Sequence, residues 1–260
     1  IIKTKGEKEG LESSELHNKY SSDFHYNSHY EIDAEAFDYF KEYDSKATIH
    51  EHKRLHEQIF ALIESKEGII LDVGCGNAWV SKMGNKQGLK VISMDISLRN
   101  PLMALKNNPD TNHFGLVADV YDLPIKDKSM DYIVASEIME HVADPRKFIE
   151  ILYGKLKEGG KLIITTPYNE KIEYNLCVHC NKLTPQHAHL HSFNEKNIKD
   201  LLPEKCEWRW IKFSNKYLVR LRTHVILQYA PFRLWQVIDT LVNKIVKEPT
   251  RLLIEVGTNS

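Results

Sequence analysis

Between residues 68 and 166, five short apolar runs alternate with stretches of helical periodicity. The runs predict strands that are buried on both faces, near residues 68–73, 90–94, 113–118, 130–136 and 161–166. Helices are predicted near residues 78–86, 101–106, 137–142 and 145–156. With further strands near 207–213 and 251–256, the pattern predicts an α/β fold: a doubly wound, mostly parallel sheet of about seven strands, with helices on both faces.

The rest of the chain predicts additions to this sheet. Residues 1–64 are expected to form a polar tail and a helical cap, with two helices between residues 32 and 64 and the charged stretch 51–54 on a solvated face. Residues 65–260 form the predicted main domain, with a Cys/His-rich loop near 168–192 and a helical insertion near 216–249. A further helix is predicted near 194–202.

Composition narrows the classes of partner. The formal net charge is −1, so no overall field attracts the chain to nucleic acid, which argues against a nucleic-acid partner and leaves only a local basic patch to bind one. Four cysteines in 260 residues do not form a disulfide framework. No apolar run reaches 18 residues and no secretion signal is visible, so we expect a cytoplasmic protein without a transmembrane segment.

A glycine loop follows the first predicted strand, in the segment Asp72-Val73-Gly74-Cys75-Gly76. A tight turn from strand to helix needs residues that accept positive φ and allow a ligand close to the backbone. The backbone N–H groups at the start of the next helix favour a polar or anionic ligand group. A purely structural turn would use the same residues, so the loop alone does not identify a binding site.

Acidic residues end the next two predicted strands. Asp95 lies about twenty residues after the loop, where a doubly wound sheet places a carboxylate that accepts hydrogen bonds from ribose hydroxyls. A dinucleotide site would need a third glycine at the position of Trp79, so a nucleoside without a pyrophosphate fits better. Asp119 can accept from an adenine amino group, with Val120 and Ile96 against the ring, or it can act as a turn cap.

Together these segments resemble the class I S-adenosylmethionine methyltransferases, over about residues 65–202. The resemblance is carried by LDVGCGNA (71–78), VISMDIS (91–97), ADVYDLP (118–124), MDYIVASEIMEHVADP (130–145) and LKEGGKLIITTP (156–167). It implies that the glycine loop binds the methionine moiety, Asp95 the ribose and Asp119 the adenine. The expected cofactor site comprises Asp72, Gly74, Cys75, Gly76, Asp95, Ile96, Asp119, Val120 and Ser136. Ala78 departs from the family pattern, in which a third glycine is common.

Glu137, Glu140 and His141 are spaced to share one face of the helix predicted at 137–142. With a later histidine they could hold a divalent cation, and this pattern is similar to small-RNA 2′-O-methyltransferases and to metal-assisted quinone-pathway O-methyltransferases. Similar residues occur in metal-free members of the class, and we favour a metal-free site. His141 is the expected general base, because an imidazole titrates near neutral pH, and Glu137 and Tyr168 complete the expected catalytic set.

The Cys/His-rich loop carries a CxxC pair, Cys177 and Cys180, followed by His187, His189 and His191. Two thiolates with His187 and His191 would satisfy a structural tetrahedral zinc site. The alternative is a pair of reduced cysteines beside solvated histidines. The composition of the loop therefore suggests structural zinc as a second cofactor.

Basic and aromatic residues interleave through residues 205–251. A solvated basic face over an aromatic core is the favoured interpretation, and the alternatives are contact with an anionic substrate, nucleic acid or lipid. We expect an enzyme that methylates a small-molecule or carbohydrate-like acceptor at oxygen, in a pocket among Tyr26, Tyr30, His141, Tyr168 and this basic segment. An RNA 2′-O-methyltransferase and a non-catalytic S-adenosylmethionine-binding regulator remain as alternatives.

Overall fold

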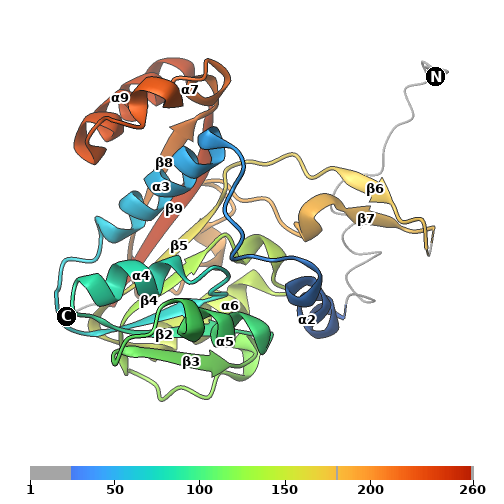
Figure 1. Ribbon diagram of the computed structural model, residues 1–260, viewed down its shortest axis with the longest axis vertical. Coiled ribbons are helices and arrows are strands. Elements are labelled where there is room, and N and C mark those ends of the chain that lie inside the picture. The colour runs from blue at the N-terminus through green and yellow to red at the C-terminus, as the bar shows by residue number, and fades with distance from the viewer. Residues whose placement is uncertain (1–24, 180, 259–260) are drawn as a thin grey trace.

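The computed structural model describes residues 25–179 and 181–258, which are built around a sheet of seven strands (Figure 1). In spatial order the strands are β3 (His113–Val117), β2 (Lys90–Asp95), β1 (Ile69–Val73), β4 (Met130–Ser136), β5 (Leu156–Pro167), β9 (Pro249–Gly257) and β8 (Glu207–Asn215). Strands β1 to β5 pair in parallel, whereas β9 is antiparallel to both β5 and β8. The predicted mostly parallel, doubly wound sheet is confirmed.

Helices cover both faces of the sheet, because each buried strand presents apolar side chains alternately to the two sides. On β1, Ile70 packs in the core formed with α3 (Lys46–Phe60), α4 (Trp79–Lys86) and α9 (Phe232–Val246). Leu71 points into the opposite core, with Phe148 and Ile149 of α6 (Pro145–Lys155). The remaining crossover helix, α5 (Arg99–Asn107), packs against β2 and β3.

Sequence signals explain where α6 and the core strands begin and end. Asp144 caps α6 by accepting a hydrogen bond from the Lys147 N–H at 3.0 Å, and Pro145 occupies the first turn, where its missing N–H costs nothing. Because these cues are local, the predicted span of this helix agrees with the structure to within one residue at its end.

Two predicted helices are wrong. At 137–142 the structure has a single 3-10 turn, η3 (Met139–His141), because Glu137 adopts a φ of +57° directly after β4. At 194–202 it has another, η5 (Lys199–Leu201). In both segments the backbone turns repeatedly over the end or edge of the sheet, and tertiary contacts outweigh the local helical spacing.

The N-terminal cap differs from the prediction in its limits. Its helices are α2 (Tyr26–Ala36) and α3, so α2 begins before the predicted stretch and ends before Phe37 and Phe40. The charged stretch 51–54 is not wholly solvated, because Arg54 is 1% exposed. Its guanidinium forms an ion pair with Glu57 and donates hydrogen bonds to the carbonyls of Leu227 and Ala230 at 2.6 and 2.8 Å. Arg54 therefore ties α3 to the C-terminal insertion.

The two predicted insertions have different structures. The segment 168–192 is not a simple loop, because it contains a hairpin, β6 (Tyr174–Leu176) and β7 (Leu183–Pro185), followed by the 3-10 turn η4 (Gln186–Ala188). Figure 1 shows the hairpin projecting away from the sheet. The segment 216–249 is helical as predicted, with α7 (Lys216–Arg220), α8 (His224–Leu227) and α9. Within the described ranges, no helix combines the length and apolar character needed to cross a bilayer.

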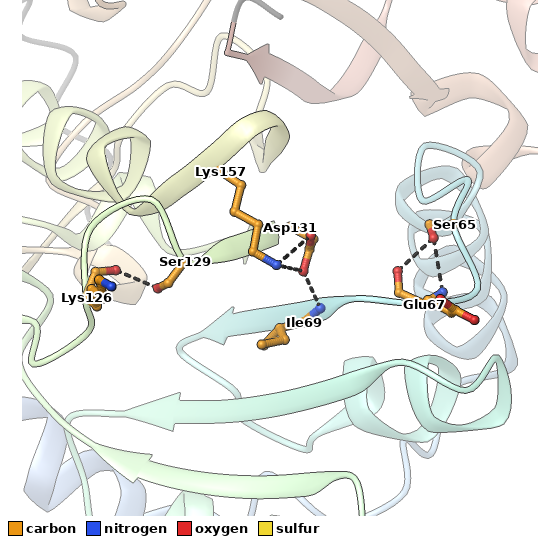
Figure 2. A network of polar contacts seen from close by, with 7 residues as sticks. All are labelled: Ser65, Glu67, Ile69, Lys126, Ser129, Asp131 and Lys157. Atoms are coloured by element: carbon orange, nitrogen blue, oxygen red, sulfur yellow. Dashed lines mark hydrogen bonds and ion pairs between the residues drawn. The ribbon is translucent and has the colours of Figure 1, made fainter.

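Asp131 joins two strands at the amino edge of the sheet (Figure 2). Its carboxylate accepts hydrogen bonds from the Ile69 N–H at 2.8 Å and from the Lys157 ammonium at 2.8 and 2.9 Å. The carboxylate therefore fixes the first residue of β1 against β4 and β5. This edge lies opposite the carboxyl ends of the parallel strands, where ligands bind in sheets of this kind.

Candidate functional site

A cavity of about 230 Å³ lies at the carboxyl edge of the sheet. Its walls come from the glycine loop, the ends of β2 and β4, the segment after β3, and α2. Eight residues of the predicted site line it: Gly74, Gly76, Asp95, Ile96, Asp119, Val120, Glu137 and His141. Residues separated by more than sixty positions in the chain therefore meet around one concave space.

The glycine loop turns with a left-handed backbone. Gly74 and Gly76 have φ values of +68° and +44°, a region that residues with a Cβ rarely adopt. A Cβ on Gly74 would lie 2.3 Å from Cδ1 of Ile138, which is far inside van der Waals contact. The Cys75 N–H donates to the Met94 carbonyl at 2.8 Å and holds the loop against β2. Ala78 also has a positive φ, of +57°, so the position occupied by glycine in many family members keeps a glycine-like conformation.

Asp95 is 9% exposed at the end of β2, and its carboxylate is held by two protein donors. The Ser97 N–H and the Asn100 side-chain amide each donate to it at 3.0 Å. A carboxylate has about four acceptor positions, so two remain for hydroxyl groups of a ligand. Asn100, which also lines the cavity, was missed in the sequence, where nothing distinguishes it from other polar residues at the start of a helix.

Asp119 caps a turn, which is one of the two roles that the sequence left open, and it also lines the cavity. One carboxylate oxygen accepts from the Tyr121 N–H at 2.9 Å and caps the 3-10 turn η2 (Val120–Asp122). The other accepts from the Tyr26 hydroxyl at 2.5 Å, so α2 is tied across the cavity. Arg99 holds the far end of α2 by donating to the carbonyls of Ala34 and Glu35 at 3.0 and 2.8 Å. Tyr30, Asp33 and Tyr39 complete this cover, and the last two were missed in the sequence.

Three residues of the expected cofactor set do not line the cavity. Cys75 is 2% exposed with its thiol in the core, and burial raises its pKa. The Ser136 hydroxyl contacts the Thr165 hydroxyl at 3.0 Å. Asp72 is buried beneath the loop, where burial and the nearby charge of Asp95 raise the pKa of its carboxyl. Alternation along β1 explains the position of Asp72, because its neighbour Val73 lines the cavity and points to the opposite side.

Glu137 lies at the turn after β4 rather than on a helix. Its carboxylate forms an ion pair with Arg251 of β9, and its backbone N–H donates to the Thr165 carbonyl at 2.9 Å. The expected common face of Glu137, Glu140 and His141 is therefore wrong. Arg251 was missed in the sequence, because it lies more than a hundred positions from its partner.

Glu140 and His141 instead meet His189 from the segment after the hairpin. One potential ligand atom from each of these three residues lies within 4.8 Å of the others. The His189 Nδ1 lies 2.5 Å from the Glu170 carboxylate, and the His141 Nδ1 lies 3.2 Å from the Ala188 carbonyl. Because carboxylate and carbonyl oxygens accept hydrogen bonds, both Nδ1 atoms carry a proton. The Nε2 of His141 keeps its lone pair, because the pKa of this imidazole is lowered to about 4.

Burial sets the protonation of this cluster. Glu140 is 1% exposed, and the loss of solvent raises its pKa to about 8. Burial also lowers the pKa of His141 to about 4, with a further contribution from the nearby His189. At neutral pH the Glu140 carboxyl is therefore protonated and the His141 imidazole is neutral. Within the described ranges, one oxygen of the Glu140 carboxyl has no hydrogen-bond partner.

Tyr168 and the expected zinc ligands lie elsewhere. The Tyr168 hydroxyl donates to Glu195 at 2.7 Å, and the residue does not line the cavity. Cys177 lies at the turn of the hairpin, where its N–H bonds to the Lys182 carbonyl at 2.9 Å. The His191 Nε2 lies 2.9 Å from the Val142 carbonyl. Cys180 is outside the described residues, and among those described Cys177, His187 and His191 do not form a metal-binding cluster.

Comparisons with known proteins place the chain in a family. Residues 40–206 match the model of a methyltransferase domain. A ubiquinone biosynthesis O-methyltransferase of Coxiella burnetii is 32% identical over 100 residues, which cover 37% of this chain and 42% of that protein. The mitochondrial enzyme of that name in Dictyostelium discoideum is 25% identical over 197 residues, covering 62% of this chain and 60% of its own length. The chain thus spans about half the length of these curated relatives.

Solved structures share the fold. An S-adenosylmethionine-dependent methyltransferase from Mesorhizobium loti superposes with a TM-score of 0.57 at 15% identity, over 78% of this chain and 97% of that one. The [4+2]-cyclase SpnF gives the same TM-score at 14% identity, over 79% and 80% of the two chains. With the domain match covering more than half of its length, the chain belongs to the class I S-adenosylmethionine-dependent methyltransferases.

Proposed function

We propose that this protein transfers the methyl group of S-adenosylmethionine to an oxygen atom of a small-molecule acceptor. The observation that carries the proposal is the cavity in which the glycine loop, Asp95 and Asp119 converge on one side and His141 closes the other. Relatives named ubiquinone biosynthesis O-methyltransferase support oxygen as the acceptor atom. An acceptor with a phenolic or sugar hydroxyl suits the cavity, whose walls are aromatic on the side of α2.

The cofactor would lie along the three strand ends. In this arrangement Asp95 accepts from the ribose hydroxyls, and Asp119 accepts from the adenine amino group between Ile96 and Val120. The turn at Gly74 and Gly76 leaves room for the methionine moiety. Methyl transfer needs the acceptor oxygen, the methyl carbon and the sulfur in line, so orientation within the cavity supplies much of the catalysis.

Calorimetric titration with S-adenosylhomocysteine tests the cofactor site. Asp95→Ala removes the acceptors for two hydroxyl groups, and we expect affinity to fall on the order of a hundredfold, because hydrogen bonds to a charged group are strong. Asp110→Ala, in an exposed turn outside the cavity, is the matched control and should bind as the wild type does. Undiminished binding by Asp95→Ala would contradict the proposed cofactor site.

His141 is the proposed general base for the acceptor hydroxyl. Its Nε2 keeps a lone pair, and its ring is fixed by the Ala188 carbonyl and by edge contact with Tyr30 at 6.0 Å between centroids. A base whose pKa is about 4 is unprotonated at neutral pH, but it is too weak to remove the proton of an ordinary hydroxyl efficiently. The hydroxyl itself must therefore be acidified, either by its own ring chemistry or by a bound cation.

The cluster of Glu140, His141 and His189 favours a cation-assisted version of the same reaction. One carboxyl and two imidazole nitrogens form a donor set for a divalent ion, and Glu170 orients His189 as carboxylates orient metal-bound histidines. The unpartnered Glu140 oxygen is consistent with a missing ligand. Such an ion would lower the pKa of an acceptor hydroxyl that contacts it. His141 would then act by holding the ion instead of taking the proton.

One set of assays separates these possibilities. Formation of S-adenosylhomocysteine is measured with a panel of phenols, sugars and RNA, before and after chelation and with Mg²⁺, Mn²⁺ or Zn²⁺ restored. Loss on chelation and recovery with one ion support the cation-assisted reaction, whereas full activity after chelation with loss in His141→Ala supports the base. Turnover with RNA alone would instead favour an RNA methyltransferase, and product from no acceptor would favour a non-catalytic binding protein.

A further inference from the structure

Helix α9 has two apolar faces, and only one of them is packed. Trp235 is 4% exposed and lies in the core over the sheet. On the opposite side Leu234, Val237, Leu241 and Ile245 are 52%, 55%, 53% and 81% exposed. Their spacing of three and four residues places them in one stripe along the helix. The solvent-facing side of a surface helix normally carries polar residues, so an apolar stripe there indicates a contact surface.

The preceding helices extend the exposed apolar surface. In α7, α8 and the residues around them, Leu221, Val225, Ile226 and Tyr229 are 73%, 56%, 76% and 83% exposed. Arg54 of α3 fixes this segment through the Leu227 and Ala230 carbonyls. Figure 1 shows α7 and α9 together at one end of the molecule. We call the exposed apolar residues of α7–α9 the insertion face.

Positive charge is concentrated in the same segment. Residues 216–247 hold six lysines and arginines, namely Lys216, Arg220, Arg222, Arg233, Lys244 and Lys247, and all six are exposed. Their one acidic residue, Asp239, is 2% exposed and accepts from the Ser214 and Asn215 N–H groups at 3.0 and 2.8 Å. Arg233 and Lys244 lie together along one side of the stripe on α9. In a chain of net charge −1, this insertion is strongly basic.

We propose that the insertion face docks on the surface of an anionic lipid membrane. Aliphatic side chains flanked by Arg and Lys match the acyl boundary and the negative headgroups of such a surface. Nucleic acid would instead favour exposed aromatic rings on which bases stack, and the exposed residues here are mostly Leu, Val and Ile. Helix α7 follows β8, which runs in the same direction as β5, so it begins at the edge of the sheet that holds the cavity.

Flotation with lipid vesicles tests the proposal without any methyl acceptor. The full chain is mixed with vesicles of phosphatidylcholine alone or of phosphatidylcholine and phosphatidylglycerol in equal parts. We expect flotation with the anionic vesicles, weakened by high salt because exposed charges are screened. Leu241→Gln with Ile245→Gln should reduce vesicle affinity by about tenfold or more. Arg233→Gln and Lys244→Gln should each reduce it about fivefold.

Leu102→Gln is the matched control. Leu102 is 54% exposed on α5, close to the 53% of Leu241, and it lies outside the insertion face. It should float as the wild type does, and thermal melting should show that all variants are folded. Absence of flotation with anionic vesicles overturns the proposal, and so does equal loss in Leu102→Gln. Binding of single-stranded RNA without vesicle binding, or a dimer that Leu241→Gln abolishes, assigns the face to another partner and also overturns it.

Discussion

The two edges of the central sheet differ in how their acidic residues are partnered. At the amino edge, both oxygens of Asp131 accept hydrogen bonds from a backbone N–H and a lysine (Figure 2). At the carboxyl edge, Asp72, Glu137 and Glu140 each keep one buried carboxylate oxygen that has no partner in the described part of the chain. Asp95 and Asp119 at the carboxyl edge have a partner on each oxygen, so the difference between the edges lies in these three carboxyl groups.

A buried oxygen without a hydrogen-bond partner lowers the stability of the folded state, and native proteins contain few of them. Their concentration beside the cavity indicates that this edge is organised for a ligand, whereas the amino edge is organised for stability. Substitutions at the carboxyl edge should therefore change binding more than folding, and substitutions at the amino edge should do the reverse.

The largest expected effect is at Gly74. Gly74→Ala places a Cβ 2.3 Å from Ile138 in a backbone of positive φ, so the loop must move. We expect cofactor affinity to fall more than a hundredfold, with a loss of stability of about 1–2 kcal/mol. Gly154→Ala is the control, because its added Cβ meets no atom within 4 Å and the residue lies on α6. Calorimetry measures the cofactor affinity of both variants, and denaturant unfolding measures their stability. Unchanged affinity in Gly74→Ala would contradict the expected role of the carboxyl edge in binding.

A smaller effect is expected at Asp131. Asp131→Ala leaves the Ile69 N–H and the Lys157 ammonium without their acceptor and should lower the free energy of unfolding by about 1–2 kcal/mol. Affinity for S-adenosylhomocysteine should not change, because the residue lies at the opposite edge from the cavity. Asp131→Asn keeps an acceptor for the backbone and should lose less. If Asp131→Ala weakened binding more than folding, the division between the edges would fail.

The smallest effect at neutral pH is expected at His56, where the contrast is a pH slope. The His56 ring stacks on Trp79, at the start of α4, with 3.8 Å between centroids, and burial lowers its pKa to about 3. An unfolded histidine takes up a proton below about pH 6.5, whereas folded His56 does not until much lower pH. Its contribution to stability is therefore full above pH 6.5 and is lost as pH falls toward 3.

His56→Phe keeps a stacking ring but removes the titration. Unfolding of this variant should take up about one proton fewer between these pH values, so its stability should fall less steeply with acid. His25→Phe, at an exposed position, is the control and should keep the wild-type slope. Urea unfolding at a series of pH values measures the difference, and identical slopes in His56→Phe and the wild type would contradict the prediction.

The central part of the fold was predictable because its signals are local. Each strand from β1 to β5 is a short apolar run, and α6 begins at an Asp-Pro pair that caps it. The residues from Glu137 to Val142 misled the prediction, because helical spacing on its own does not reveal that a residue of positive φ follows β4. The described part of the Cys/His-rich segment misled it in another way, since His189 joins Glu140 and His141 while Cys177 lies at the tip of a hairpin.

The sequence by itself determined the sheet, the glycine loop and the acidic residues at the ends of β2 and β3, because strand periodicity and turn chemistry act over a few residues. Only the tertiary structure decided that His189 joins Glu140 and His141, that Arg251 pairs with Glu137, and that Tyr26 reaches Asp119. These pairs lie about fifty to more than a hundred residues apart. Their meeting depends on how insertions pack over the sheet, and side-chain periodicity carries no information about that.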